Sequence, residues 1–80
     1  MPTLSIIMPV LNEDGGIEDA LRALAPHRAR GVEIIVVDGG STDATPEIAR
    51  AFADRVVAAP RGRGSQMNAG VGAARGDVPG

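Results

Sequence analysis

Three short apolar runs constrain the fold of this chain more than any other feature of its sequence. They are rich in β-branched residues and nearly continuous, and they occupy residues 4–10 (LSIIMPV), 32–37 (VEIIVV) and 55–59 (RVVAA). Strands that are buried on both faces of a parallel sheet have this character. The sequence therefore predicts three strands of one parallel sheet.

The segments between and after these runs have the spacing of amphipathic helices. Apolar residues recur there every three or four positions, as on one face of a helix. The three stripes are Ile17, Ala20, Leu21 and Leu24; Ile48, Ala49, Phe52 and Ala53; and Met67, Val71 and Ala74, the last interrupted by Gly70 and Gly72. Residues suited to helix ends flank the stripes: Asn12 or Asp14, Gly31, Thr45 before Pro46, Gly64 or Ser65, and Gly76.

This alternation of strands and helices predicts an α/β architecture. Successive parallel strands are joined by right-handed crossovers, so we expect a partial Rossmann-like sandwich of three α/β/α layers with strand order 3-2-1. The first two helices should share one face of the sheet, and the third should cover the other face. Asp77 and Val78 would begin a fourth strand. We therefore expect residues 1–80 to be part of a larger domain, with an unpaired strand edge that favours self-association.

The composition argues against several classes of protein. A net charge of −2 and a single aromatic residue, Phe52, argue against a nucleic-acid partner. The chain has no Cys, which excludes disulfides and thiolate metal sites. No apolar run approaches the roughly 20 residues of a transmembrane helix, and the N-terminus lacks the basic segment of a signal peptide. We expect a cytoplasmic protein, with peripheral membrane association of the intact protein left open.

Polar and glycine-rich residues follow each apolar run, at the sheet edge where open α/β sheets bind ligands. Asp38 directly follows the second run, and two interpretations stay open. Its carboxylate caps the next turn by accepting backbone N–H groups, or it accepts an N–H group of a nucleotide base. Gly39 and Gly40 either serve a tight turn or let a ring approach the backbone.

The loops after the other two runs are also ambiguous. Asn12 and Glu13 can belong to a helix cap or bond a ribose hydroxyl. Arg61 and Arg63 lie among glycines at a helix start, where they suit a diphosphate, although a solvated loop would have the same sequence. Asp43 is interpreted as structural, because a carboxylate is favourable at the start of the second helix.

Three segments in this order and spacing resemble the start of the inverting family 2 glycosyltransferases, which have the GT-A fold: SIIMPVLNE, EIIVVDGGSTDAT and RGRGSQMNAGVGAARGDV. The last segment looks like a bacterial subgroup of that family. The resemblance implies an enzyme that, when intact, transfers a sugar from a nucleoside diphosphate sugar, usually UDP-linked, to an acceptor. Residues 1–80 would be the N-terminal nucleotide-sugar-binding portion of its GT-A domain.

The resemblance also implies roles for single residues. Asp38 matches the acid that hydrogen-bonds the base, and Glu13 faces the ribose. Many relatives have an Arg directly before the Asn that matches Asn68, whereas this chain has Met67 there, so the basic contact stays open between Arg61 and Arg63. The residues expected to bind the nucleotide are Pro9, Leu11, Asn12, Glu13, Asp38, Gly39, Gly40, Arg61, Arg63 and Asn68.

Other functions of such an enzyme are expected to lie beyond residue 80. In the family, an Asp-x-Asp motif that binds Mg²⁺ or Mn²⁺ follows the fourth strand, and the catalytic base comes later still. We therefore expect neither a catalytic residue nor a metal ligand in residues 1–80, and no activity from this chain alone. Two alternatives stay open: a nucleotidyltransferase or other nucleotide-binding α/β enzyme, and a non-catalytic module that self-associates through its sheet edge.

Overall fold

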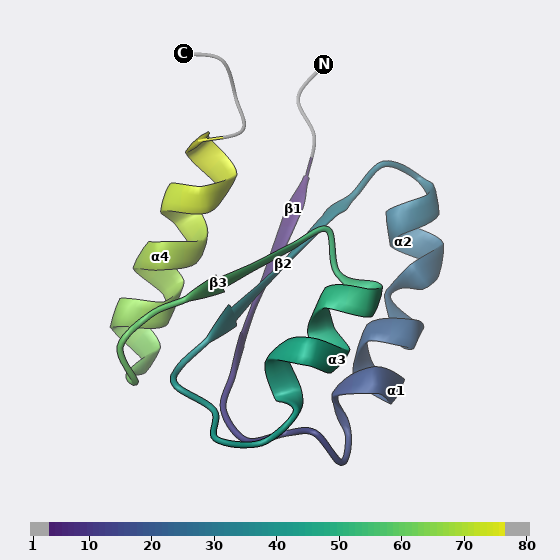
Figure 1. Cartoon of the computed structure of the whole chain (residues 1–80). Coiled ribbons are helices and arrows are strands. Elements are labelled where there is room, and N and C mark those ends of the chain that lie inside the picture. The colour runs from purple at the N-terminus through teal and green to yellow at the C-terminus, as the bar shows by residue number, and fades with distance from the viewer. Residues whose placement is uncertain (1–3, 77–80) are drawn as a thin grey trace.

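The computed structural model describes residues 4–76, without the side chains of Arg63 and residues 73–76, as three α/β/α layers (Figure 1). The predicted fourth strand at Asp77 and Val78 lies outside the described residues. The elements in chain order are β1 (Ser5–Val10), α1 (Ile17–Ala23), α2 (Ala25–Ala29), β2 (Glu33–Asp38), α3 (Thr45–Phe52), β3 (Arg55–Ala58) and α4 (Arg63–Gly76).

The sheet is parallel, with β2 between β1 and β3. This confirms the predicted strand order, and each strand begins and ends within one residue of its apolar run. In the register, Asp38 pairs with Val10 on one side and with Ala58 on the other. The carboxyl ends of all three strands, and the loops that follow them, therefore meet at one edge of the sheet.

Alternate residues of β2 face different layers. Ile34 and Val36 join the main core, which α1 and α3 complete with residues such as Ile17 and Ala49. Val37 points toward α4, which packs on the other face of the sheet. As predicted, α1, α2 and α3 lie on one face and α4 lies on the other (Figure 1).

The first helical segment is divided, which the sequence analysis did not predict. α1 ends at Ala23, Leu24 lies between the two helices, and α2 begins at Ala25. Pro26 has no N–H group to donate to the carbonyl of Arg22, so a continuous helix would lose a hydrogen bond there. Gly31, with φ +94°, follows the end of α2 in the position predicted for a terminal glycine.

The predicted N-cap residues were wrong. Gly16 occupies the N-cap of α1 instead of Asn12 or Asp14, and Ala44 occupies that of α3 instead of Thr45. Neither helix has a side-chain cap bond at that position. The polar side chains of these loops bond mainly across to the neighbouring loop, and the Asp43 carboxylate also accepts the first N–H group of α3, that of Thr45.

The face of α4 that packs on the sheet also differs from the predicted one. Met67 and Val71 are exposed, whereas Gln66 and Gly70 are buried. A Cβ atom on Gly70 would lie 2.3 Å from Cγ2 of Ile7. The glycine therefore lets the helix backbone approach the sheet more closely than any side chain would allow.

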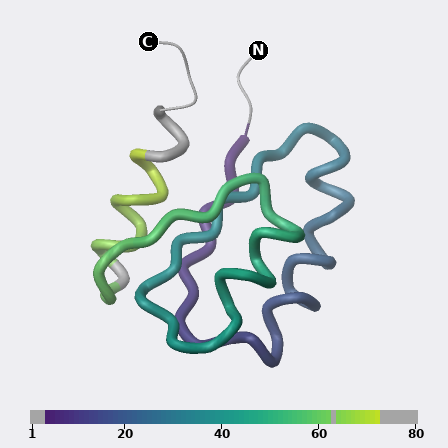
Figure 2. The backbone as a smooth tube through the Cα atoms, in the orientation of Figure 1, coloured from purple at the N-terminus to yellow at the C-terminus, as the bar shows by residue number. Residues whose placement is uncertain are grey.

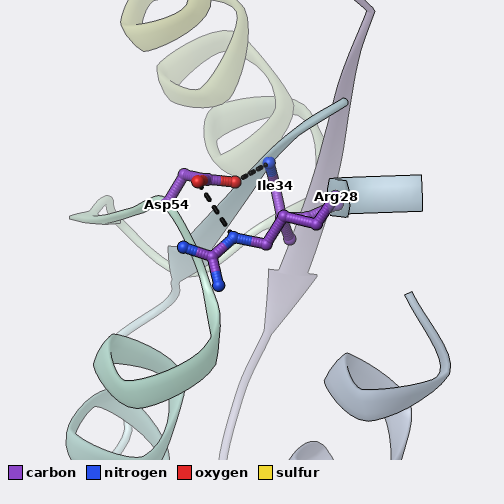
Figure 3. A network of polar contacts seen from close by, with 3 residues as sticks. All are labelled: Arg28, Ile34 and Asp54. Carbon is purple, nitrogen blue, oxygen red and sulfur yellow. Dashed lines mark hydrogen bonds and ion pairs between the residues drawn. The ribbon is translucent and has the colours of Figure 1, made fainter. Parts of the chain in front are cut away.

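Opposite the carboxyl edge, a single carboxylate joins three elements (Figure 3). Asp54, just before β3, accepts the backbone N–H of Ile34 at 2.8 Å and the Nε–H of Arg28 from α2 at 2.9 Å. These bonds attach α2 and the start of β3 to the amino end of β2.

None of the helices in the described part of the chain is long and apolar enough to cross a bilayer.

Candidate functional site

The loops after β1 and β2 lie side by side at the carboxyl edge of the sheet (Figure 2). The backbone N–H of Asn12 donates to Oγ of Ser41 at 2.8 Å, and the N–H of Thr42 donates to Oδ1 of Asn12 at 2.8 Å. The N–H of Glu13 donates to Oγ1 of Thr45 at 2.8 Å. Asn12 has φ +50°, a left-handed conformation that Asn tolerates better than most residues. The two loops therefore form one hydrogen-bonded unit.

Asp43 extends this unit. Its carboxylate accepts the backbone N–H of Thr45 at 2.9 Å and that of Asp14 at 3.2 Å, together with the hydroxyl of Thr45. These bonds, led by the one from the Thr45 hydroxyl, lower the pKa of Asp43 below its ordinary value of 3.8. The geometry agrees with the structural interpretation of this residue.

Asp38 is buried, and its carboxylate is bonded by its own loop. Oδ2 accepts the N–H groups of Gly40 at 3.1 Å and Ser41 at 2.9 Å, while the Ser41 hydroxyl donates to Oδ1. The turn cap is therefore present. The base-reading role stays a prediction, and it is compatible with this geometry. A carboxylate oxygen has two lone pairs, and the described residues supply one bond to Oδ1.

The two glycines after Asp38 serve different purposes. Gly40 has φ +96°, which the turn requires. Gly39 is buried, and a Cβ atom there would lie 2.9 Å from Cδ and Oε1 of Gln66. Gly39 therefore makes room for a protein side chain, a role that the sequence analysis did not consider.

Gln66 is the residue of this region that sequence reasoning missed. Its Nε2 donates to the carbonyls of Val10 at 3.1 Å and Val37 at 3.0 Å, and its Oε1 accepts the N–H of Gly62 at 3.3 Å. Gln66 is 6% exposed. The available signal was spacing: Gln66 lies four residues before Gly70, so both share one helix face.

An open cleft of about 470 Å³ lies at this edge, lined by Pro9, Val10, Leu11, Glu13, Arg61, Gly62 and Gln66. Four of the predicted nucleotide-binding residues are thus brought together: Pro9, Leu11, Glu13 and Arg61. Five others do not line the cleft: Asn12, Asp38, Gly39, Gly40 and Asn68. The side chain of Arg63 lies outside the described residues.

The cleft combines a carboxylate, a guanidinium group and apolar surface. Oε2 of Glu13 accepts the N–H of Leu11 at 3.3 Å, which holds the carboxylate at the loop. Carboxylates accept bonds from sugar hydroxyls, and guanidinium groups pair with phosphates. Within the described range, no three His, Asp or Glu side chains are grouped to hold a metal ion. The cleft therefore offers a hydrogen-bond acceptor for hydroxyl groups and a cation for an anionic group.

Comparison with known proteins gives consistent matches. The model of glycosyl transferase family 2 matches residues 5–78. A low-salt glycan biosynthesis hexosyltransferase, Agl6 of Haloferax volcanii, is 46% identical over 79% of this chain and 16% of its own length. The succinoglycan biosynthesis protein ExoO of Rhizobium meliloti is 36% identical, and a putative glycosyltransferase of Bacillus subtilis, EpsH, is 33% identical, each over 95% of this chain.

The aligned region is a small part of each relative. The chain spans 16% to 24% of the length of these three proteins. No solved structure gives a significant match.

Proposed function

This chain belongs to glycosyl transferase family 2, and we propose that it forms the nucleotide side of the donor site in an enzyme that transfers a sugar from a nucleoside diphosphate sugar to an acceptor. The observation that carries this proposal is the cleft at the carboxyl edge, where Glu13 and Arg61 come together from two different loops. Parallel sheets bind nucleotides at this edge. The relatives named as a hexosyltransferase and a glycosyltransferase support the same class of reaction.

Three side chains at this edge, two in the cleft and Asp38 outside its lining, have chemistry that matches parts of a nucleoside diphosphate. We assign the Glu13 carboxylate to a ribose hydroxyl and the Arg61 guanidinium group to the diphosphate. We assign the spare acceptor capacity of the Asp38 carboxylate to the base. An ionised carboxylate only accepts hydrogen bonds, so it suits the N3–H of uracil, and we propose UDP as the carrier.

The chemical step needs groups that we place beyond residue 80. We propose a GT-A domain that inverts the anomeric centre, in which a general base removes the proton of the acceptor hydroxyl. Bound Mg²⁺ or Mn²⁺ would neutralise the leaving diphosphate. The described residues offer no ligand set for it. We also propose a cytoplasmic site of action, and self-association through the edge of β1 when this chain is isolated.

Calorimetric titration of the full-length protein tests the proposal. UDP should bind more tightly than GDP or NAD. Arg61→Gln should weaken UDP binding by about one to two decades, because losing a charge-assisted bond costs about 1.5–3 kcal/mol. Binding of uridine, which has no phosphate, should be unchanged.

Arg50→Gln is the matched control, because Arg50 is exposed on α3 and does not line the cleft. It should leave both affinities at the parent values. NAD binding tighter than UDP, or equal UDP affinity in the parent and Arg61→Gln, would contradict the proposal.

A further inference from the structure

We propose that Gln66 is a positioning residue for the donor cleft: its carboxamide sets the position of the loop that carries Arg61 relative to the end of β1. This inference rests on the proposed function. It concerns how the cleft keeps its shape, and it assigns a role to a side chain that would not itself touch the reacting atoms.

The hydrogen bonds of Gln66 join three segments that are distant in the sequence. Both N–H groups of its amide are used, on the carbonyls of Val10 in β1 and Val37 in β2, and its oxygen accepts the N–H of Gly62. Val10 and Gly62 both line the cleft, as does Gln66 itself. One side chain thus bridges the β1 wall of the cleft to the loop between β3 and α4.

The loop turns at Gly62, directly after Arg61. Gly62 has φ +135°, a conformation that residues with a side chain rarely adopt but that glycine reaches readily. Two bonds to Gln66 restrain Gly62: its carbonyl accepts the backbone N–H of Gln66 at 2.9 Å, and its N–H donates to the Gln66 carboxamide at 3.3 Å. Only the second bond depends on the side chain at position 66, and it holds the peptide that joins Gly62 to Arg61. Arg61 precedes Gly62 directly, so a change at the Gly62 peptide moves the guanidinium group.

The packing around the Gln66 carboxamide restricts its orientation. Gly39 lies so close to it that a Cβ atom would approach Cδ to 2.9 Å. The group is buried, both of its N–H groups donate and its oxygen accepts one bond, which together favour one orientation of this polar side chain. An apolar residue of similar length would fill the same space and impose no such orientation on the loop.

Two variants of the full-length protein test the proposal. Gln66→Met keeps the length and removes the three hydrogen bonds. We expect roughly a tenfold loss of UDP affinity with a much smaller change for uridine, because a displaced Arg61 loses its contact with the phosphates. A merely structural role would lower stability without producing this difference between UDP and uridine.

Gln66→Glu provides a second test, because the ionised and protonated forms of one variant can be compared by changing the pH. Its ionised carboxylate would still accept from Gly62 but would face two carbonyl oxygens without a proton to donate. Protonation restores one donor, so UDP affinity relative to the parent should rise as the pH falls. If Gln66→Met does not fold, the pH dependence of Gln66→Glu tests the proposal instead. A ratio of Gln66→Glu to parent UDP affinity that stays constant with pH would then overturn it.

Asp54→Ala is the matched control, since it removes two side-chain bonds from the opposite end of the same sheet. It should lower stability and leave the ratio of UDP to uridine affinity unchanged. If the parent does not bind UDP, the proposed function fails. If the parent binds UDP and Gln66→Met keeps the parent ratio of UDP to uridine affinity, only the role of Gln66 fails.

Discussion

An aspartate forms hydrogen bonds at each end of β2, the buried Asp38 at the carboxyl end and the exposed Asp54 at the amino end, and the two bond to different kinds of partner. At the amino end, Asp54 accepts bonds from Ile34 in β2 and Arg28 in α2, which lie 20 and 26 residues away in the sequence. At the carboxyl end, Asp38 accepts bonds from Gly40 and Ser41, two and three residues away.

The two aspartates therefore serve different purposes: Asp54 stabilises packing between elements, and Asp38 shapes a loop beside the proposed binding site. The bonds of Asp54 join secondary-structure elements, so they stabilise the way α2 and β3 are assembled on β2. The bonds of Asp38 shape a local loop, and that loop is then bonded to its neighbour through residues such as Asn12. The bonds at the carboxyl end therefore hold loops in place beside the cleft that Glu13 and Arg61 line, whereas those at the amino end join secondary-structure elements.

The largest expected effect is at Asp38. Asp38→Ala should lower UDP affinity by about one to two decades, because a charge-assisted bond worth about 1.5–3 kcal/mol is lost. It should also lower stability, because the N–H groups of Gly40 and Ser41 lose their acceptor. Calorimetry and urea unfolding measure the two effects separately. A well-folded Asp38→Ala protein with UDP affinity within twofold of the parent would mean that the carboxylate only caps the turn.

Gly39→Ala should have the next largest effect. The added Cβ would press on the carboxamide of Gln66, which its hydrogen bonds hold in place. Overpacking of this kind costs about 1–3 kcal/mol of unfolding free energy. Gly72→Ala is the control, since a Cβ there meets nothing within 4 Å. Equal stability of the two variants in urea unfolding would show that the carboxamide yields easily.

Asp54→Ala should be weaker and confined to stability. The N–H of Ile34 loses its bond and the partly exposed ion pair with Arg28 is removed, for which we expect a loss of about 1 kcal/mol. UDP affinity should match that of the parent. A clear fall in affinity for the folded variant would show that the two ends of β2 are coupled.

The smallest expected effect is on the free energy of unfolding at acidic pH. The pKa of Asp43 is lowered in the folded protein, so its bonds stabilise the fold above the ordinary carboxyl pKa and are lost as the pH falls through the folded value. Asp43→Asn should therefore remove part of the decline in unfolding free energy below pH 3.8. Urea unfolding at several pH values checks this, and parallel pH profiles for parent and variant would contradict it.

The sequence alone was sufficient for the layout of the fold. Runs of β-branched residues, such as IIVV at 34–37, form strands wherever they can be buried, and helical spacing between them leaves parallel pairing as the ordinary solution. The edge that carries the site follows from the same argument, because parallel strands end together. Pro9, Leu11, Glu13 and Arg61 could be assigned to that edge for this reason.

What only the tertiary structure decided is how side chains at that edge are used. Apolar spacing favoured Met67 and Val71 as the buried face of α4, yet the helix packs through Gly70 and Gln66, because close approach to Ile7 leaves no room for a side chain. The spacing of apolar residues along a helix indicates which face is buried, but it carries no information on how closely the helix backbone approaches the sheet. The bonds from Gln66 to Val10 and Val37 span 56 and 29 residues. Such partners are set by strand register and helix placement, which arise only when the whole sheet has formed.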